Sequence, residues 1–408
     1  MTSEALTPVE KTFVRDPTIT RGQSALALHP VARLPEDWSA AMAALGEKAF
    51  RGKQLFRWIH ERGVFDPEQM TDLSRNLRLR LVDEGLGEPG EVELVHESVD
   101  GTRKILLSLA HGAKIESVIL PMTPGSLDAD VDDGSDEGDE PEPNQPKRRV
   151  TLCISTQFGC AMGCVFCASG QAGLFRGLGA AEVVYQVLVA RRYLRRDEEI
   201  RNLVFMGMGE PLHHYEETWR SLKLLTHPDA AGMSPRRITV STVGLVPGIR
   251  RLGEDFGGKV GLAISLHAPD DETRSRILPM NKKYPIAELM RALREYPLPP
   301  RRRLTIEYTL IGGVNDSLQQ ADRLAELLRD LRVKINLIPM NGIEASELKS
   351  PKGAQVLAFR ERLSSHGYSC FVRTRRGDDV SAACGQLAMQ AISPRRLTRR
   401  KPGSGDAS

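Results

Sequence analysis

The sequence predicts an α/β protein built around a partial (β/α) barrel, preceded by a small helical unit and a short antiparallel meander. Three observations support this prediction. From Arg149 onward, apolar segments of strand length alternate with helical segments, as they do in parallel β/α units. Before that point, the spacing of apolar residues is first helical and then has the two-residue period of strands. The length of 408 residues, 40% of them hydrophobic, suits one large domain and a smaller one.

The N-terminal part divides into an irregular extension and a helical accessory domain. Residues 1–36 show no sustained periodicity. In residues 37–90, apolar side chains such as Phe50 and Leu55 recur at helical spacing, and one or two further short helices are expected over residues 65–81. Basic side chains give this unit a basic face, and the sequence leaves open whether that face is merely solvated or contacts RNA. These side chains are Lys48, Arg51, Lys53, Arg57 and Arg62.

Residues 91–122 are expected to form the antiparallel meander. Three alternating segments cover residues 91–98, 103–110 and 113–121, and the turn dipeptides Asp-Gly and His-Gly separate them. Each segment has the length of an ordinary strand. The short connections favour antiparallel neighbours.

An acidic segment follows the meander. Residues 123–148 are expected to be a disordered insert, because their Pro, Gly and Asp content cannot bury a core. Residues 126–146 carry nine acidic side chains and no basic one. Since the whole chain has a net charge of +3 despite these nine, the remainder stands at +12. This excess indicates an anionic partner, with nucleic acid the obvious candidate, although a merely basic soluble protein remains an alternative.

Residues 149–390 are expected to form the barrel with a functional C-terminal loop, and residues 391–408 a basic, flexible tail. Helices fit between the strands, for example over residues 180–194 and 286–296. The predicted strands cover residues 150–156, 202–207, 237–242, 260–268, 303–311, 334–340 and 370–374.

The use of cysteine points to metal or redox chemistry. The chain has six cysteines, no secretory signal and no apolar run that could span a bilayer, which predicts a cytoplasmic protein without membrane contact. Clustered cysteines in such a chain more often bind metal than form a disulfide framework. Cys160, Cys164 and Cys167 follow the first barrel strand with C-x3-C-x2-C spacing, so a compact loop brings three thiolates together.

Three thiolates suit a [4Fe–4S] cluster that keeps one iron open to a substrate, because such a cluster normally takes four. Zinc is the main rival. A structural zinc site needs four ligands, however, and no nearby His or Cys completes a finger-like pair. We therefore expect one [4Fe–4S] cluster per chain, held by Cys160, Cys164 and Cys167.

Polar residues and glycines stand at the ends of several predicted barrel strands. Gly207, Gly209 and Glu210 follow the second strand, where glycines would let the backbone approach a ligand and Glu210 would face an ammonium or a ribose hydroxyl. Taken singly, such residues are more often caps or turns. Together they mark one barrel end, where active sites lie. The others are Ser241, Ser265, His267 and Asn341.

The three-cysteine motif resembles that of the radical S-adenosylmethionine (SAM) superfamily. This resemblance implies that SAM binds the open iron and is cleaved reductively to methionine and a 5′-deoxyadenosyl radical. Over residues 37–390 the chain is similar, more closely, to the RlmN/Cfr family of RNA adenine methyltransferases. The motifs that carry this similarity are ESVILP, TLCISTQFGCAMGCVFC, MGMGEPL, STVGLVPGI, SLHAP, IPMN and RGDDVSAACGQL.

The family resemblance implies a role for individual residues. Cys384 matches the cysteine that is methylated and then attacks the adenine ring as a thiomethylene radical. Cys153 matches the cysteine that resolves the protein–RNA adduct through a transient disulfide with Cys384. Glu116 matches the proton acceptor. The residues that match the SAM-binding positions of the family are Gly209, Glu210, Ser241, Ser265, Leu266, His267 and Asn341.

Plainer interpretations of these residues exist. Cys384 alone would be a small buried residue, although its Gly- and Asp-rich setting favours a reactive thiol. Cys153 falls inside a strand and fits a core, and Glu116 fits a solvated strand position. Cys370 matches no family position, so we expect it to be structural.

Three functions compete. The favoured one is methylation of carbon 2 of adenosine in 23S rRNA and in tRNA next to the anticodon, because the chain carries the full CISTQFGCAMGCVFCASGQAG run of the RlmN branch. The second is the carbon 8 methylation of the Cfr branch, and the third is a non-catalytic iron–sulfur RNA-binding protein. Intact Cys153 and Cys384 argue against the third. The expected partners are 23S rRNA, tRNA and a one-electron donor such as flavodoxin, and the protein is expected to be a monomer.

Overall fold

The computed structural model describes residues 28–122, 147–342, 346–373, 376–380, 382 and 385–387. Most of the N-terminal extension, the acidic insert and the C-terminal tail lie outside the described residues, and so does Cys384. In the described part of the chain, no helix is both long and apolar enough to cross a membrane.

One sheet organises the molecule. Within the described residues it has ten strands in the order β1-β2-β3-β4-β7-β8-β9-β10-β11-β12. The first four pair antiparallel, and from β4 to β12 every pair is parallel. The strands are β1 Gly90–Glu97, β2 Arg103–Leu109, β3 Lys114–Pro121, β4 Arg148–Cys153, β7 Glu198–Phe205, β8 Ile238–Thr242, β9 Gly261–Ser265, β10 Leu304–Leu310, β11 Val333–Pro339 and β12 Cys370–Val372.

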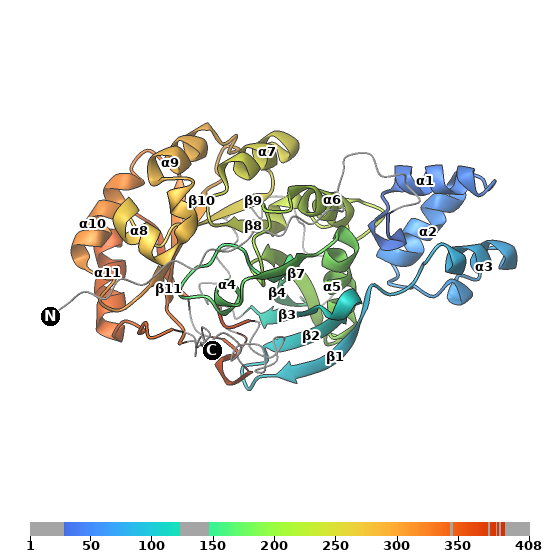
Figure 1. Cartoon of the computed structure of the whole chain (residues 1–408), viewed down its shortest axis with the longest axis horizontal. Coiled ribbons are helices and arrows are strands. Elements are labelled where there is room, and N and C mark those ends of the chain that lie inside the picture. Colours follow the sequence, from blue (N-terminus) through green and yellow to red (C-terminus); the bar gives the residue numbers. More distant parts are fainter. Residues whose placement is uncertain are drawn as a thin grey trace, which may run out of the picture.

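Helices connect the parallel strands and lie around the curved sheet, which gives the partial (β/α) barrel that the alternation predicted (Figure 1). Local sequence fixes several helix ends. The Asp270 side chain caps one helix start, Ser317 and Gln320 form a capping box at another, and Gly257 ends a third in the left-handed conformation. The helices are α5 Ala180–Arg192, α6 Tyr215–Thr226, α7 Val246–Phe256, α8 Asp271–Ile277, α9 Ile286–Glu295, α10 Leu318–Leu327 and α11 Gly353–Ser365.

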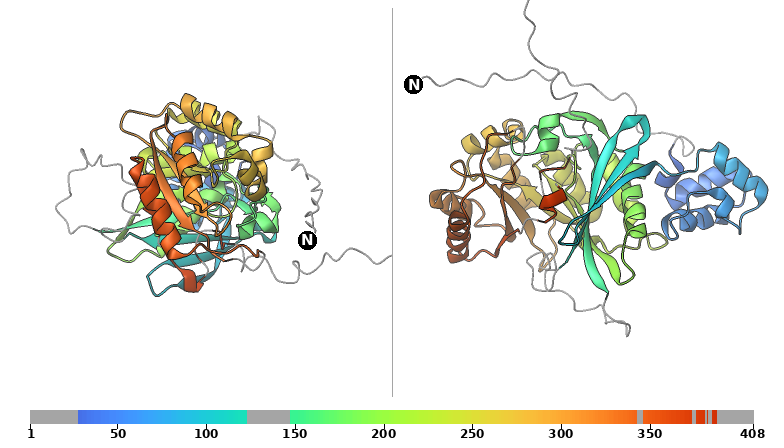
Figure 2. Two further views of the ribbon diagram at one scale, coloured as in Figure 1. Left: turned by 90° about the vertical axis from the view of Figure 1, so that its left-hand side faces the viewer. Right: turned by 90° about the horizontal axis from the view of Figure 1, so that it is seen from below.

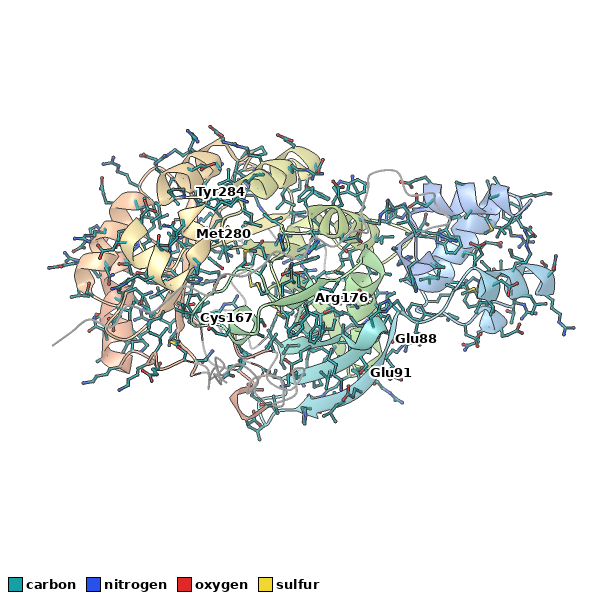
Figure 3. The ribbon with its side chains drawn as sticks, in the orientation of Figure 1. Glu88, Glu91, Cys167, Arg176, Met280 and Tyr284 are labelled. Atoms are coloured by element: carbon teal, nitrogen blue, oxygen red, sulfur yellow. The ribbon has the colours of Figure 1, made fainter. Side chains whose placement is uncertain are left out.

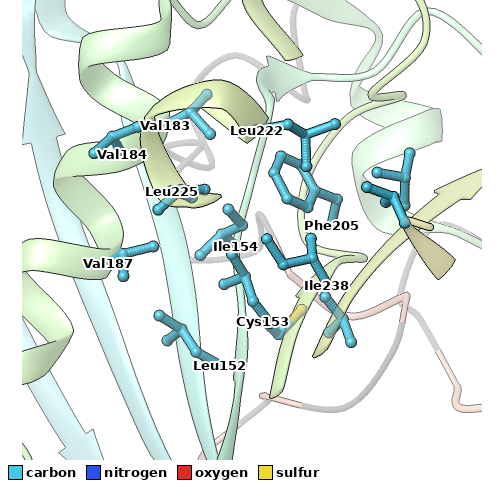
Figure 4. Packing of buried hydrophobic residues seen from close by; sticks show 14 of the residues in the cluster. Leu152, Cys153, Ile154, Val183, Val184, Val187, Phe205, Leu222, Leu225 and Ile238 are labelled. Atoms are coloured by element: carbon cyan, nitrogen blue, oxygen red, sulfur yellow. The ribbon is translucent and has the colours of Figure 1, made fainter. Parts of the chain in front are cut away.

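The two faces of the sheet differ in polarity. On the outer face, Leu152 and Ile154 lie beside the valines of α5 and form part of the main hydrophobic core (Figure 4). On the inner face, the register places Ser265 opposite Glu307 and Glu307 opposite Asn336. Residues paired in this way share a face. The barrel interior is therefore polar between β9 and β11, unlike the apolar filling of a closed barrel.

The predicted meander is an extension of the barrel sheet. Its strands β1, β2 and β3 match the three predicted segments. Strand β3 then pairs antiparallel with β4, so that Pro121 stands opposite Val150. This pairing is not evident from the sequence, because the acidic insert separates the two strands.

The N-terminal helices form a separate small unit beside α5 and α6 (Figures 1 and 2). Several of its apolar side chains, among them Trp38, Leu55 and Phe56, are fully buried. Ion pairs join it to the barrel, including Arg220 with Asp37 at 2.6 Å. The elements are η2 Pro30–Ala32, α1 Pro35–Ala44, α2 Phe50–His60, η3 Pro67–Gln69 and α3 Arg75–Asp83.

Candidate active site

The three clustered cysteines lie in a compact loop at one end of the barrel. The loop is enclosed by a hairpin of β5 (Gln157–Gly159) and β6 (Leu174–Gly177) and by the short helix α4 (Ala168–Ala172), which the sequence analysis missed. Backbone hydrogen bonds anchor it, including Cys160 N to Gly173 O at 3.0 Å. Cys160 and Cys164 are buried, whereas Cys167 is partly exposed. Cys167 lies near the middle of the molecule in the view of Figure 3.

This thiol set fits an iron–sulfur cluster. Burial, followed by the charges of Cys167 and Cys160, raises the pKa of the Cys164 thiol, so three thiolates together need a compensating positive charge such as iron. Among the described residues, no group of three or more His, Cys, Asp or Glu is arranged to hold a metal ion. A four-iron cluster does not require such convergence, because each thiolate binds a different iron.

A cavity, partly open to solvent, lies between the cysteine loop and the strand ends. It brings together residues that are up to 225 positions apart in the sequence, from Cys160 to Gly385. The predicted residues that line it are Cys160, Cys164, Cys167, Gly209, Glu210, Ser241, Ser265, His267 and Asn341. Leu266 is not among the lining residues, and it belongs to the main hydrophobic core.

Glu210 is a buried carboxyl group at the cavity wall. Burial raises its pKa to about 7, even though the backbone N–H groups of Val243 and Leu212 donate to its two oxygens at 2.8 and 3.0 Å. Such a group gains a full charge readily when a cation approaches. Glu210 is therefore suited to receive an ammonium group.

His267 presents a neutral imidazole to the cavity. Its backbone adopts a φ of 59°, which is unusual for a residue other than glycine. The Asn315 side chain donates to its carbonyl oxygen at 2.7 Å and helps to hold this conformation. Burial lowers the His267 pKa to about 3. Because Nδ1 accepts a hydrogen bond from Thr309 N at 2.9 Å, the ring proton is on Nε2.

The glycines after β7 lie close to neighbouring protein atoms as well as to the cavity. A Cβ at Gly207 would lie 2.7 Å from Ile154 O, and one at Gly209 would lie 2.6 Å from the Gln157 side chain. Gly209 also has a φ of +106°. Both glycines line the cavity, so they shape its wall through close backbone packing.

Glu116 is fully buried, so the solvated alternative for it is wrong. Its carbonyl oxygen accepts a hydrogen bond from Ser155 Oγ at 2.6 Å, and the same Oγ accepts one from Met208 N at 2.9 Å. Ser155 thus links β3 to the glycine turn of the cavity wall. The carboxylate forms an ion pair with Lys104, with 3.1 Å between Nζ and Oε1.

Cys153 lies near Glu116 on the inner face of the sheet. The register pairs Cys153 with Val118, two residues after Glu116 on β3, so these side chains share a face. Cys153 is 8% exposed and packs with the core, and neither it nor Glu116 is among the residues that line the cavity.

The described part of the C-terminal loop contacts the cysteine loop. Gly385, which follows Cys384 in the sequence, lines the cavity, and its carbonyl oxygen accepts a hydrogen bond from Ala168 N at 2.8 Å. Ser169 Oγ donates to Leu387 O at 2.9 Å. Cys384 itself lies outside the described residues.

Two further site residues escaped the sequence analysis. Arg274 is buried, and its guanidinium donates to the carbonyl oxygens of Val243, Ser265 and Leu266, so it fixes the ends of β8 and β9. Burial lowers its pKa to about 10. Glu307 lines the cavity, and its Oε1 accepts a hydrogen bond from Asn336 Nδ2 at 2.9 Å. A single sequence offers no signal for either, because their partners come from other strands.

The cysteine loop at the end of a parallel-strand barrel defines the class of protein. Residues 154–331 match the family model of the radical SAM superfamily. Residues 36–84, which hold most of the helical unit, match a model described as the ribosomal RNA large subunit methyltransferase N-terminal domain. The chain is a radical SAM enzyme, and SAM and a [4Fe–4S] cluster are the cofactors of this class.

Similar proteins then identify the family. The chain is 61% identical to the dual-specificity RNA methyltransferase RlmN of Sorangium cellulosum over 90% of this chain and 97% of that one. It is 43% identical to the corresponding protein of Marinobacter nauticus over 88% and 92%. A crystal structure of a radical SAM methyltransferase from Sphaerobacter thermophilus superposes with a TM-score of 0.79, at 38% identity, over 88% of this chain and 99% of that one. The chain belongs to the RlmN family of radical SAM methyltransferases.

Proposed function

We propose that this chain is a dual-specificity RNA methyltransferase that methylates carbon 2 of adenosine in 23S rRNA and in tRNA next to the anticodon. The observation that carries this proposal is the 61% identity, over nearly the whole of both chains, to a protein named a dual-specificity RNA methyltransferase. The cavity between the three cysteines and the strand ends supports it. The RlmN relatives favour carbon 2 over the carbon 8 reaction of the Cfr branch.

In this proposal SAM lies across the strand ends. Glu210 receives its amino group, and Gly209, Ser241, Ser265, His267 and Asn341 line the rest of its site. Leu266 would contribute through its backbone, because its side chain is in the core. Cys160, Cys164 and Cys167 would hold the [4Fe–4S] cluster, which supplies the electron that cleaves SAM.

Cys384, Cys153 and Glu116 are assigned the thiol and proton chemistry. Carbon 2 of adenine lies between two ring nitrogens and is too electron-poor for an ordinary methyl transfer, so a radical on the methylated Cys384 adds to it. Glu116 then takes the proton of carbon 2, and the odd electron of the adduct would return to the cluster. Attack of the Cys153 thiolate on the Cys384 sulfur then forms the disulfide and breaks the bond between that sulfur and the methylene carbon, which takes up a proton to become the methyl group. The shared inner face of Glu116 and Cys153 supports this assignment, as does the position of Gly385 at the cavity.

The domain division follows from the same proposal. Residues 37–90 would contact RNA, residues 91–122 and 149–390 would carry the catalytic sheet, and the enzyme would act as a monomer with a flavodoxin-like electron donor. Lys53 and Arg57 pair with Asp229 of the barrel, at 3.1 Å from Nζ and 3.0 Å from Nε. The remaining basic side chains of the unit would therefore dominate its contact with phosphates.

Mass spectrometry of nucleosides tests this function. We expect rRNA and tRNA from a deletion strain to lose 2-methyladenosine and a plasmid copy to restore it. A Cys384→Ala copy should fail to restore it while keeping the absorbance of the cluster. Restoration of 8-methyladenosine instead would assign the Cfr reaction, and no change in either nucleoside would refute both.

A further inference from the structure

Glu116, the assigned proton acceptor, is one member of a buried ion pair. Lys104 of β2 and Glu116 of β3 are each 1% exposed in their side chains, with 3.1 Å between Nζ and Oε1. No motif singled out Lys104, which looks like an ordinary strand residue in the sequence.

The register places this pair on the functional face of the sheet. Lys104 stands opposite Val118 on β3, and Val118 stands opposite Cys153 on β4. Directly paired residues point to the same side, and so do residues two apart on one strand. Lys104, Glu116 and Cys153 therefore lie on one inner face, and an ammonium, a carboxylate and a thiol share a small part of it.

Burial of such a pair is costly. Removing both charges from water is unfavourable, and a well-packed apolar pair is often as stable or more so. Stability alone therefore gives little reason for the pair. An ammonium next to a buried carboxylate does have one clear effect, because the charge-assisted contact holds the carboxylate in one orientation.

We infer that Lys104 is a positioning residue that holds the Glu116 carboxylate in the orientation that accepts the proton of carbon 2 from the protein–RNA adduct. This inference rests on the proposed function. In the step concerned, the carbon–hydrogen bond breaks, its proton forms an O–H bond with Glu116, and its electron pair stays on the ring. Lys104 keeps all its protons and touches no reacting atom.

The test uses the cluster-loaded Lys104→Met enzyme with an RNA substrate. SAM cleavage, measured as 5′-deoxyadenosine, precedes the proton transfer and should stay within about threefold of wild type. Formation of 2-methyladenosine should fall by about a hundredfold, as expected when a general base is disabled. Covalent protein–RNA adduct should accumulate on a denaturing gel, although Cys153 is intact.

Arg103 offers a matched control on the same strand. It pairs with Glu198 at 2.6 Å, both side chains are buried, and it points to the opposite face of the sheet. Arg103→Met therefore also breaks a buried ion pair, but it should accumulate no adduct. Lys104→Arg, which retains the charge, should restore part of the methylation.

The outcomes separate this inference from the proposed function. Wild-type enzyme that forms no 2-methyladenosine contradicts the function itself. If wild type is active, normal methylation by Lys104→Met overturns the inference. The inference is also overturned if Lys104→Met and Arg103→Met both form less 5′-deoxyadenosine and neither accumulates adduct. Should Lys104→Met not fold, Lys104→Gln replaces it, and the same accumulation of adduct is expected.

Discussion

At the scale of single residues, burial controls the chemistry of the cavity. Glu210 and His267 are both buried beside it, yet burial shifts their pKa values in opposite directions, to about 7 and about 3. Both shifts favour the neutral form, because charge is costly away from water. The cavity thus offers a ligand a neutral imidazole donor and a carboxyl group that ionises readily near a cation.

The raised pKa of Glu210 predicts a pH-dependent stability of the SAM-free protein. The folded protein holds this proton up to about pH 7, whereas the unfolded chain releases it near 4.5. The contribution of Glu210 to the unfolding free energy is therefore full below pH 4.5 and declines as the pH rises to 7. We therefore compare the unfolding free energies of Glu210→Gln and wild type at two pH values. The difference in favour of the variant should grow by about 2 kcal/mol from pH 5.5 to pH 8. Denaturant melts at both pH values measure this gain.

The exposed Glu216 provides the control for that comparison, because Glu216→Gln also replaces a carboxyl group by an amide, but at an exposed ion pair whose loss changes stability little. An equal gain for both variants, or none for Glu210→Gln, would show that the carboxyl group is not held neutral by burial.

The assigned role of Cys153 also yields a residue-scale prediction. Cys153→Ala removes a small, mostly buried side chain from β4, so the fold should survive. The variant should trap a covalent protein–RNA adduct, which denaturing electrophoresis and mass spectrometry detect. Cys370→Ala is the matched control, because burial raises the pKa of that thiol to about 12 and leaves it unreactive. Turnover without adduct in Cys153→Ala would remove Cys153 from this role.

At the scale of elements, the connection between β3 and β4 is longer than the pairing of these two strands requires. Pro121 and Val150 face each other in the ladder, so the strands need only a short turn between them. The sequence between them nevertheless includes the nine acidic residues of the insert.

Replacing residues 123–146 by a four-residue turn should therefore leave Glu116 and Cys153 in place. A shorter loop loses less entropy on closure, and the unfolding free energy should rise by about 1–2 kcal/mol. Methylation in vitro should stay near the wild-type rate, and calorimetry together with nucleoside analysis measures both effects. A large loss of activity with normal melting would instead give the insert a functional role.

At the scale of the whole molecule, the helical unit is held against the barrel by polar contacts. Arg220 of α6 pairs with Asp37, and Arg191 of α5 donates to His60 O at 3.0 Å. These contacts fix the direction in which the basic side chains of the unit face. RNA binding should therefore depend on them even where they touch no RNA.

Arg220→Ala tests this dependence. Because the Arg220–Asp37 pair is partly exposed, its loss should cost at most about 1 kcal/mol of unfolding free energy. The KM for RNA should rise severalfold, and its dependence on salt should keep its slope, since Arg220 is assigned no phosphate contact. Lys48→Ala is the comparison, and it should lower that slope by about one unit. An equal fall in slope for both variants would contradict the orienting role.

The sequence by itself determined the order of the elements and the three-cysteine loop. Alternating strands and helices predicted the parallel barrel, and the spacing of Cys160, Cys164 and Cys167 predicted the site of the cluster, because both signals are local. Only the tertiary structure decided how β3 meets β4, how Arg274 fixes two strand ends and how Lys104 faces Glu116. These contacts join strands separated by turns, helices or the insert. Which side chains meet there depends on the pairing register, and a single sequence does not encode that register locally.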